Sequence, residues 1–296
     1  MAYILGVGIA TLDIVNYLDS YPNEDSEVRA DAQQSSRGGN ATNTLVILSQ
    51  LGEQCEWAGV LASDPSSQII RQDLQNHGIN FQRCPVKDDS ITPTSYIILN
   101  RRNGSRSIVH YRDLPELDLA AFKRYDLSHY QWLHFEGRAV NETLLMMQYA
   151  KQQQPQLPCS LEIEKPRKGI EKLFAKADLL LFSRHYAEAH GYHNAAGLLH
   201  AMQSQAPHAR LICAWGSEGA FALDQQGGVI HTPAFTQSQV VDSLGAGDTF
   251  NASIIHNLLK GTSLAQALHD SCYLAGLKCS QQGFNNLVER YRQRDS

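Results

Sequence analysis

The chain has 296 residues, 43% of them hydrophobic, and a formal net charge of −5. This acidic balance argues against nucleic acid or an anionic membrane as the main partner. No apolar run approaches the roughly 18 residues that a membrane span requires, and the N-terminus lacks the pattern of a secretory signal. We therefore expect a cytoplasmic protein with a substantial core, organised either as one large α/β domain with a small appendage or as two domains.

The first third of the sequence predicts strands of two kinds. Residues 3–10 form a short apolar strand, whereas residues 11–21 and 27–37 alternate polar and apolar side chains. A second polar pair, at 92–100 and 105–111, is joined by Asn-Gly, which is typical of hairpin turns. Such strands are too polar for the middle of a parallel sheet. We expect residues 13–37 and 92–112 to form a small β-sheet lid, and residues 1–12, 38–91 and 113–296 to form an α/β core.

From residue 131 onward, apolar strands alternate with amphipathic helices. The strands are expected at 131–137, 159–164, 177–183 and 210–216, and the helices at 142–152, 170–175, 195–203, 249–260 and 264–279. This alternation predicts a mostly parallel sheet covered by helices on both faces, which is a three-layer α/β fold. Ligands of such sheets bind beyond the carboxyl ends of the strands.

One short stretch places glycines directly before an aspartate at the start of a helix. Gly245, Ala246 and Gly247 precede Asp248, and apolar residues then recur at helical spacing. First-turn amides have no intrahelical acceptor and lie at the positive end of the helix dipole, so they suit an anion. A carboxylate beside an anion site is expected where a hydroxyl loses a proton to a base. The alternative is an ordinary strand-to-helix turn. In both cases we expect the dipole to lower the pKa of Asp248, leaving it ionised at neutral pH.

A second glycine-rich helix start lies at residues 37–43. Gly39 is followed by Asn40 and Asn43, which are three residues apart and share one face of the first turn. An asparagine N-cap alone would explain this pattern, and contact with a polar ligand is the alternative.

The sequence contains neither the P-loop motif nor the H-R-D and D-F-G motifs of protein kinases. Phosphoryl transfer to a hydroxyl needs a base, positive potential at the phosphate and exclusion of water. Asp248, the amides of residues 245–248 and the lid meet these needs. Arg106, on the lid hairpin, either reaches a phosphate or is a solvated arginine.

Residues 241–253 and 37–43 resemble the two signatures of the ribokinase-like (PfkB) carbohydrate kinases. Further stretches are similar to the ketohexokinase (fructokinase) group of that family, at 21–27, 103–106, 134–138, 162–167 and 213–216. The resemblance covers nearly the whole chain. It implies a ribokinase-like fold and ATP-dependent phosphorylation of a sugar hydroxyl, with a ketohexose such as fructose giving its 1-phosphate. A family kinase for ribose, a nucleoside or another sugar, and a non-catalytic sugar-binding protein, remain as alternatives.

The resemblance also implies roles for individual residues. Asp248 would be the catalytic base, and the amides from Gly245 to Asp248 would form the anion hole. The sugar would contact Asp13, Gly39, Asn40 and Asn43, while Asp25 would reach the sugar of the partner subunit in a homodimer formed through the lid sheets. The ATP phosphates would meet Arg106, Gly216, Ser217, Glu218 and Gly219, and the adenine pocket would be lined by Phe235, Cys272, Ala275 and Cys279. The spacing of the last three also fits a helix face in the core.

The expected metal site departs from the family pattern. Many relatives carry Asn-x-x-Glu for the water network around Mg²⁺, whereas residues 183–188 of this chain read Ser-Arg-His-Tyr-Ala-Glu. Glu164 is the candidate for holding metal-bound water. A monovalent cation, K⁺, is the other ion that the resemblance suggests.

Overall fold

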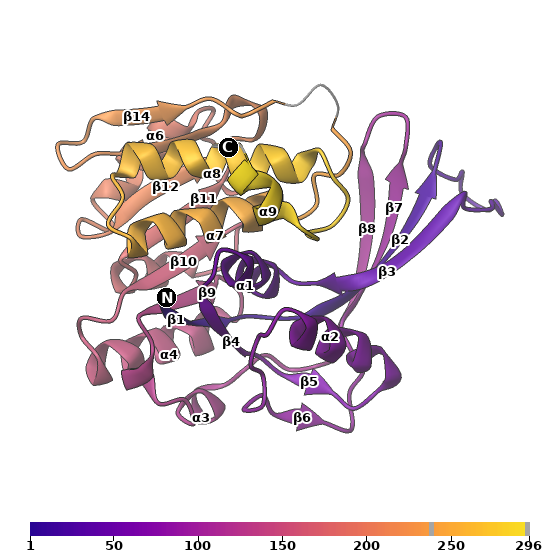
Figure 1. The fold of residues 1–296 in the computed structure, drawn as a ribbon, viewed down its shortest axis with the longest axis horizontal. Coiled ribbons are helices and arrows are strands. Elements are labelled where there is room, and N and C mark those ends of the chain that lie inside the picture. Colours follow the sequence, from indigo (N-terminus) through magenta and orange to yellow (C-terminus); the bar gives the residue numbers. More distant parts are fainter. Residues whose placement is uncertain (237–239, 294–296) are drawn as a thin grey trace.

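The computed structural model describes residues 1–236 and 240–293, and within this part the chain forms one large sheet, one smaller sheet and a two-stranded pair of short strands, β5 and β6 (Figure 1). The large sheet has eight strands in the order β14-β13-β12-β11-β10-β9-β1-β4. Their bounds are β1 Tyr3–Val7, β4 Gln54–Ala58, β9 Trp132–Glu136, β10 Cys159–Ile163, β11 Leu179–Ser183, β12 Arg210–Ala214, β13 Ala220–Leu223 and β14 Val229–Thr232. The strands from β12 to β4 pair in parallel, and β13 and β14 add an antiparallel edge.

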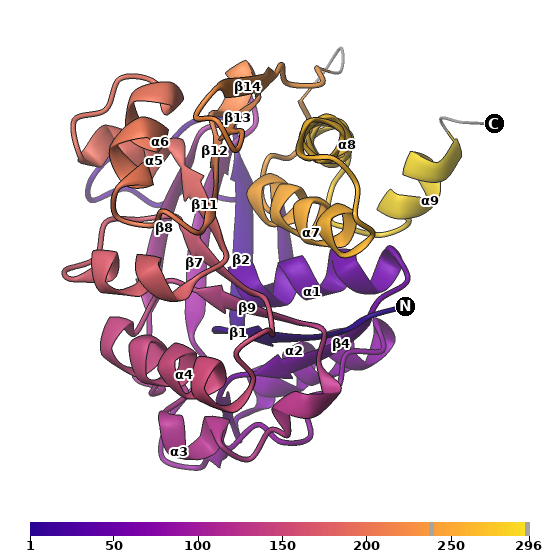
Figure 2. The ribbon, with the colours of Figure 1, turned by 90° about the vertical axis from the view of Figure 1, so that its left-hand side faces the viewer.

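Helices cover both faces of the large sheet (Figure 2). One face carries α1 (Asn40–Gln50), α7 (Ala246–Leu259) and α8 (Leu264–Cys279). The other carries α4 (Val140–Gln153), α5 (Arg184–Ala189), α6 (Ala195–Gln203) and the 3₁₀ segment η2 (Ile170–Lys176). Every residue of β9 and β10 is buried, as strands covered on both faces require. The three-layer, mostly parallel α/β fold expected from the sequence is confirmed.

The smaller sheet has the order β3-β2-β7-β8 and projects from the core (Figure 1). It consists of β2 (Thr11–Leu18), β3 (Ala32–Gly38), β7 (Thr94–Asn100) and β8 (Arg106–Tyr111). The expected strand over 27–37 begins only at Ala32, because the residues before it form an exposed turn and an irregular segment. Every residue of β8 is exposed in this single chain.

Short elements complete the fold. They are β5 Leu61–Ala62, α2 Pro65–Asn76, β6 Val86–Lys87, α3 Leu119–Phe122, η1 Leu127–His129, η3 Gly216–Glu218 and α9 Leu287–Arg292. Helix α2 begins at Pro65 because Asp64 caps it by accepting from the Ser67 amide and Pro65 fits its first position. None of the helices in the described residues is long and apolar enough to cross a membrane.

Candidate active site

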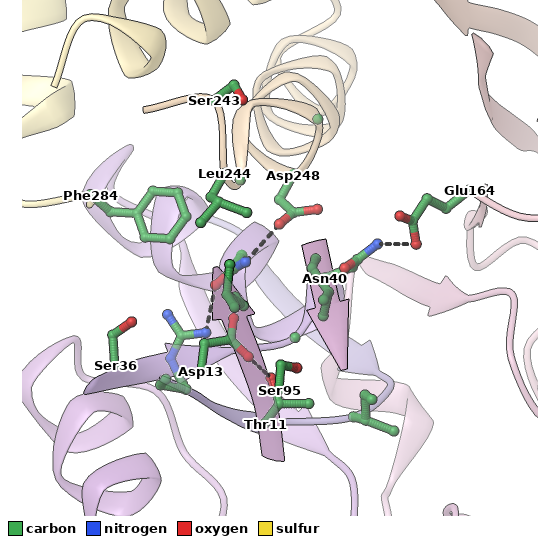
Figure 3. Close-up of a pocket in the computed structure, with 18 of the residues that line it drawn as sticks. Thr11, Asp13, Ser36, Asn40, Ser95, Glu164, Ser243, Leu244, Asp248 and Phe284 are labelled. Carbon is green, nitrogen blue, oxygen red and sulfur yellow. Dashed lines mark hydrogen bonds between the residues drawn. The ribbon is translucent and has the colours of Figure 1, made fainter. Parts of the chain in front are cut away.

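A cavity of about 730 Å³ lies where the carboxyl ends of the parallel strands face the smaller sheet (Figure 3). Its lining comes from β2, β7 and β8 on one side, and from the ends of β9 and β10 and the starts of α1 and α7 on the other. This size and position fit a small-molecule site at the strand ends of an open α/β sheet. Of the sequence candidates, the cavity lining includes Asp13, Gly39, Asn40, Asn43, Arg106, Glu164, Gly245, Gly247 and Asp248.

Asp248 is buried on the first turn of α7 and lines this cavity. The helix follows Gly245, whose φ of 77° lies in the left-handed region that favours glycine. The amide of Ala246 donates to the Ser243 carbonyl at 3.3 Å. Within the described chain, the amides of Gly247 and Asp248 have no acceptor, so these two are the donors free for an anion.

Asn43 fixes one oxygen of this carboxylate. Its Nδ2 donates to Asp248 Oδ2 at 2.7 Å, and its Oδ1 accepts from the Arg37 guanidinium at 2.7 Å. Asn43 lies in the first turn of α1 and is buried, as is Arg37 at the end of β3. The bond therefore joins two helix starts that are far apart in sequence.

Burial raises the pKa of Asp248 to about 8. The Asn43 hydrogen bond lowers the pKa, the carboxylates of Glu164 and Glu136 raise it, and the charge of Arg37 lowers it. The expectation that the helix dipole leaves this group with a lowered pKa is therefore wrong, because burial among other carboxylates outweighs the dipole. A pKa near neutrality suits a general base, since the group is then both available and a good proton acceptor.

Two further carboxylates reach the cavity from the ends of β9 and β10. Burial raises the pKa of Glu136 and of Glu162, and for Glu162 the charge of Asp248 adds to the effect. Glu162 Oε1 accepts from Asn40 Nδ2 at 3.1 Å and from Asn251 Nδ2 at 3.2 Å, whereas its Oε2 is buried without a partner in the described part of the chain. The sequence analysis did not identify either residue. The available signal was that each is an acid at the carboxyl end of an apolar strand.

Asn40 connects this group to Glu164. Its Nδ2 also donates to Glu164 Oε2 at 3.2 Å, and Figure 3 shows the two side chains facing each other beside Asp248. Glu164 is partly exposed, in contrast to the buried Glu162. The expected metal candidate thus lies at the rim of the carboxylate group.

The smaller sheet contributes polar groups to the opposite side of the cavity. Asp13 Oδ1 accepts from Thr11 Oγ1 at 2.8 Å, and burial raises the pKa of Asp13. Arg106 extends from β8 and donates to Ser243 Oγ at 3.1 Å, just before residues 245–248, which we term the anion-binding turn after their free amides. Gly39 allows a close backbone approach, since a Cβ there would lie 2.2 Å from the Ile9 carbonyl oxygen. The small sheet and the start of α7 are therefore in direct contact.

The remaining sequence candidates lie outside the lining of this cavity. Ala246 lies on the first turn of α7, and Asp25 is exposed between β2 and β3. Gly216, Ser217, Glu218 and Gly219 form the turn after β12, and Phe235 packs against Gly276 of α8, where a Cβ would lie 2.1 Å from the Phe235 carbonyl oxygen. Cys272, Ala275 and Cys279 lie along α8, and the Cys279 carbonyl accepts from the amides of Val241 and Asp242. The expected nucleotide residues thus form a second group that connects to the anion-binding turn through Asp242.

Comparison with known proteins agrees with this geometry. Residues 1–290 match the family described as pfkB family carbohydrate kinase. Ketohexokinase of Mus musculus is 40% identical over 293 residues, covering 96% of this chain and 98% of that protein. Ribokinase of Arabidopsis thaliana complexed with ribose and ATP is similar in structure, with a TM-score of 0.80 and 19% sequence identity over 99% of each chain. Ribokinase of Cryptococcus neoformans in complex with ADP is similar too, with a TM-score of 0.83 and 20% sequence identity, covering 99% of this chain and 100% of that one. At these identities the structural matches show the fold, which is ribokinase-like.

Proposed function

Because the chain belongs to the pfkB family of carbohydrate kinases, we propose that it transfers the terminal phosphoryl group of ATP to a hydroxyl of a ketohexose, specifically the C1 hydroxyl of fructose. The observation that carries the proposal is the buried carboxylate of Asp248, which lines the cavity beside free helix amides. The ketohexose is suggested by the 40% identity to the mouse protein named ketohexokinase.

In this mechanism Asp248 is the base. Asn43 holds Oδ2 at 2.7 Å, which leaves Oδ1 to accept the proton of the acceptor hydroxyl. The amides of Gly247 and Asp248 bind the negative charge of the group in transfer, where preorganised donors contribute most. An acceptor oxygen between these groups is close to both the proton acceptor and the phosphorus, so most of the catalysis is positioning.

The sugar and the nucleotide enter from different sides of this point. Asp13, Gly39 and Asn40 line the sugar side, and their carboxylate and amide groups match the hydroxyls of a sugar. Arg106 meets the phosphates at the edge of the anion-binding turn, which it already contacts through Ser243. The turn at 216–219 contacts the phosphates, and Phe235, Cys272, Ala275 and Cys279 receive the adenine. The smaller sheet covers the reacting groups and excludes water.

The residues at the strand ends fit Mg²⁺ only as part of a site shared with the nucleotide. No group of three or more His, Cys, Asp or Glu side chains within residues 1–236 and 240–293 is arranged to hold a metal by itself. Mg²⁺ commonly takes one or two carboxylates together with substrate phosphates and waters. Glu164, at the rim, and the unpartnered Glu162 Oε2 are the oxygens suited to that role. The ion supplies positive charge to the phosphates when it binds with ATP.

The oxygens around Asp242 do not fit a monovalent cation. Lys278 is completely buried, and its Nζ lies 2.8 Å from Asp242 Oδ2, 2.9 Å from the Asp242 carbonyl and 3.3 Å from the Gln281 carbonyl. These oxygens already surround one positive charge, so no step is assigned to K⁺.

The outer face of the smaller sheet suits a second copy of the chain. Strand alternation directs Ser95, Ile108 and His110 into the cavity, whereas Tyr96, Val109 and Tyr111 are 50%, 70% and 52% exposed on the other face. Tyr96 and Val109 are paired across β7 and β8, so the apolar side chains are contiguous. We propose a homodimer through these sheets, with Asp25 extending toward the partner subunit. Light scattering tests it by comparing the molar mass in solution of the Val109→Asp variant with that of the unaltered chain.

Initial rates of ADP release test the proposed reaction. The purified chain is assayed with MgATP and fructose, ribose, glucose or adenosine, and the product is identified by ³¹P NMR. We expect fructose to give the highest kcat/KM and a 1-phosphate, and Asp248→Asn to lower kcat at least 1,000-fold while sugar binding persists. A preference for ribose or adenosine would contradict the ketohexose, and a fully active Asp248→Asn would contradict the base.

A further inference from the structure

Arg37 contacts the base through a buried chain of hydrogen bonds that the mechanism above does not use. Its side chain is 2% exposed, although arginine is among the residues least often buried. Nε donates to Asp73 of α2, and one terminal nitrogen donates to Thr42 Oγ1 at 2.8 Å and to Asn43 Oδ1 at 2.7 Å. Arg37 thus links β3 to α2 and α1 beneath the cavity.

The orientation of the Asn43 amide follows from this contact. A guanidinium has only donors, so the Asn43 atom that faces it is the oxygen. The amide nitrogen then faces Asp248 Oδ2, which is an acceptor. The opposite orientation would bring two donors together at Arg37 as well as two acceptors at Asp248, so Arg37 adds to the preference for the observed orientation.

Charges of both signs act on Asp248. Glu164 after β10 and Glu136 at the end of β9 raise its pKa, whereas Arg37 lowers it, and the charge of Asp248 in turn raises the pKa of Glu162. Arg138 lies 3.4 Å from Glu136 and Lys165 lies 3.5 Å from Glu164, and the other cations that line the cavity are Arg106 and Arg167. Arg37 itself pairs with Asp73, whose side chain is 34% exposed and therefore partly screened by solvent.

We propose that Arg37 is a positioning residue for the proposed phosphoryl transfer: it holds the Asn43 amide in the orientation that donates to Asp248, and it supplies the positive charge opposing the surrounding carboxylates. The inference rests on the proposed function in that Asp248 is the base. Arg37 was not among the sequence candidates; it lines the cavity, and its hydrogen bonds go to Asp73, Thr42 and Asn43.

The pH dependence of kcat separates this role from general stabilisation. Arg37→Gln removes the charge, and Arg37→Lys retains a charged group that can only donate. Arg83→Gln is the matched control, because Arg83 pairs with the buried Glu56 at 2.8 Å and does not line the cavity. We expect Arg37→Gln to move the acid limb of the kcat profile up by about one pH unit, the lower end of what an opposite charge does. This shift corresponds to a roughly tenfold loss of kcat at pH 6, whereas the KM for sugar should stay within about threefold of its value in the unaltered enzyme.

Arg37→Lys should keep the midpoint of the unaltered enzyme and recover most of the lost rate, and Arg83→Gln should leave the profile unchanged. Titration of the Asp248 carboxyl by ¹³C NMR without substrates compares the pKa of this group among the same variants, independently of turnover. An unchanged midpoint in Arg37→Gln, or a shift of about one unit in Arg37→Lys, would overturn the inference. Inactivity of the unaltered enzyme toward every sugar would instead reject the proposed function, and the NMR titration would still decide the role of Arg37.

Discussion

Gly245 gives a test of the anion-binding turn that depends on geometry alone. Its φ is 77°, and a Cβ at this position would lie 2.3 Å from Phe284 Cζ and 2.6 Å from Cε1. Ordinary contact begins at 3.4 Å, so Gly245→Ala requires a displacement of about 1.1 Å between the turn and the ring. The left-handed backbone costs a further 1–2 kcal/mol, roughly. Because a shift of about 1 Å in reacting groups lowers a rate by on the order of 100-fold, we expect that loss in kcat.

Gly261, at the other end of α7, is the matched control. Its φ is 73°, and a Cβ there has no neighbour within 4 Å. Gly261→Ala therefore has the same backbone strain without the collision, and we expect it to lower the free energy of unfolding by about 1 kcal/mol and to leave kcat unchanged. Thermal denaturation and ADP release at saturating fructose and MgATP measure both effects.

A third variant identifies the cause of the loss. In Gly245→Ala/Phe284→Ala the ring is absent, so the turn can return toward its place and kcat should recover at least tenfold relative to Gly245→Ala. A kcat for Gly245→Ala within fivefold of that for Gly261→Ala would refute the reasoning, since the displaced turn would then not matter for the reaction.

Three other predictions follow from buried or bridging charges. Lys278→Met should lower the free energy of unfolding by about 3 kcal/mol, because it leaves the Asp242 carboxylate without its buried partner; a change under 1 kcal/mol in urea unfolding would contradict this. Arg106→Ala should raise the KM for ATP about tenfold and leave Tm within about 2 °C, because the side chain is exposed and contacts Ser243 at 3.1 Å; an unchanged KM would remove its phosphate role. Burial raises the pKa of Asp248 from an unfolded value near 3.9 to about 8. Between these two pH values the folded state holds a proton that the unfolded state has released, so the free energy of unfolding falls as the pH rises from about 4 to about 8. Asp248→Asn should therefore raise Tm at pH 8 and by less at pH 5, and equal gains at both values would contradict the sign.

Long, periodic elements of the fold could be predicted from the sequence, and short ones could not. The strands from residue 131 onward lie within a few residues of their expected positions because their apolar runs and helical partners are regular. The helices α3 (Leu119–Phe122) and α9 (Leu287–Arg292) are too short to show a period. Helix α3 is capped by the Asp118 side chain, and both helices pack on neighbouring helices, which sequence spacing does not encode.

The candidate site divides in the same way. Asp248, Asn40 and Asn43 were predictable because each lies at a glycine-rich helix start, which is a local pattern. Glu162 and Glu136 were missed because they become neighbours only through the register of β10 with β9, which pairs one directly with the other. The predicted direction of the Asp248 pKa shift was wrong for a related reason: the helix dipole is visible in the sequence, but the burial of Asp248 and the nearby charges of Glu164 and Glu136 arise only in the folded chain.

The anion-binding turn is held from several sides, and this connects the smaller sheet to the base. Lys278 binds Asp242, Phe284 packs against Gly245, and Arg106 reaches Ser243 from β8. Of these contacts, the first involves the buried Lys278 and the second the partly buried Phe284, whereas the third joins the turn to a sheet with its own exposed strand. A movement of the smaller sheet toward or away from the cavity therefore acts on the residue five positions before Asp248. If the smaller sheet acts as the proposed lid, a movement that changes the access of water to the cavity would also act on the alignment of the base through the Arg106 contact.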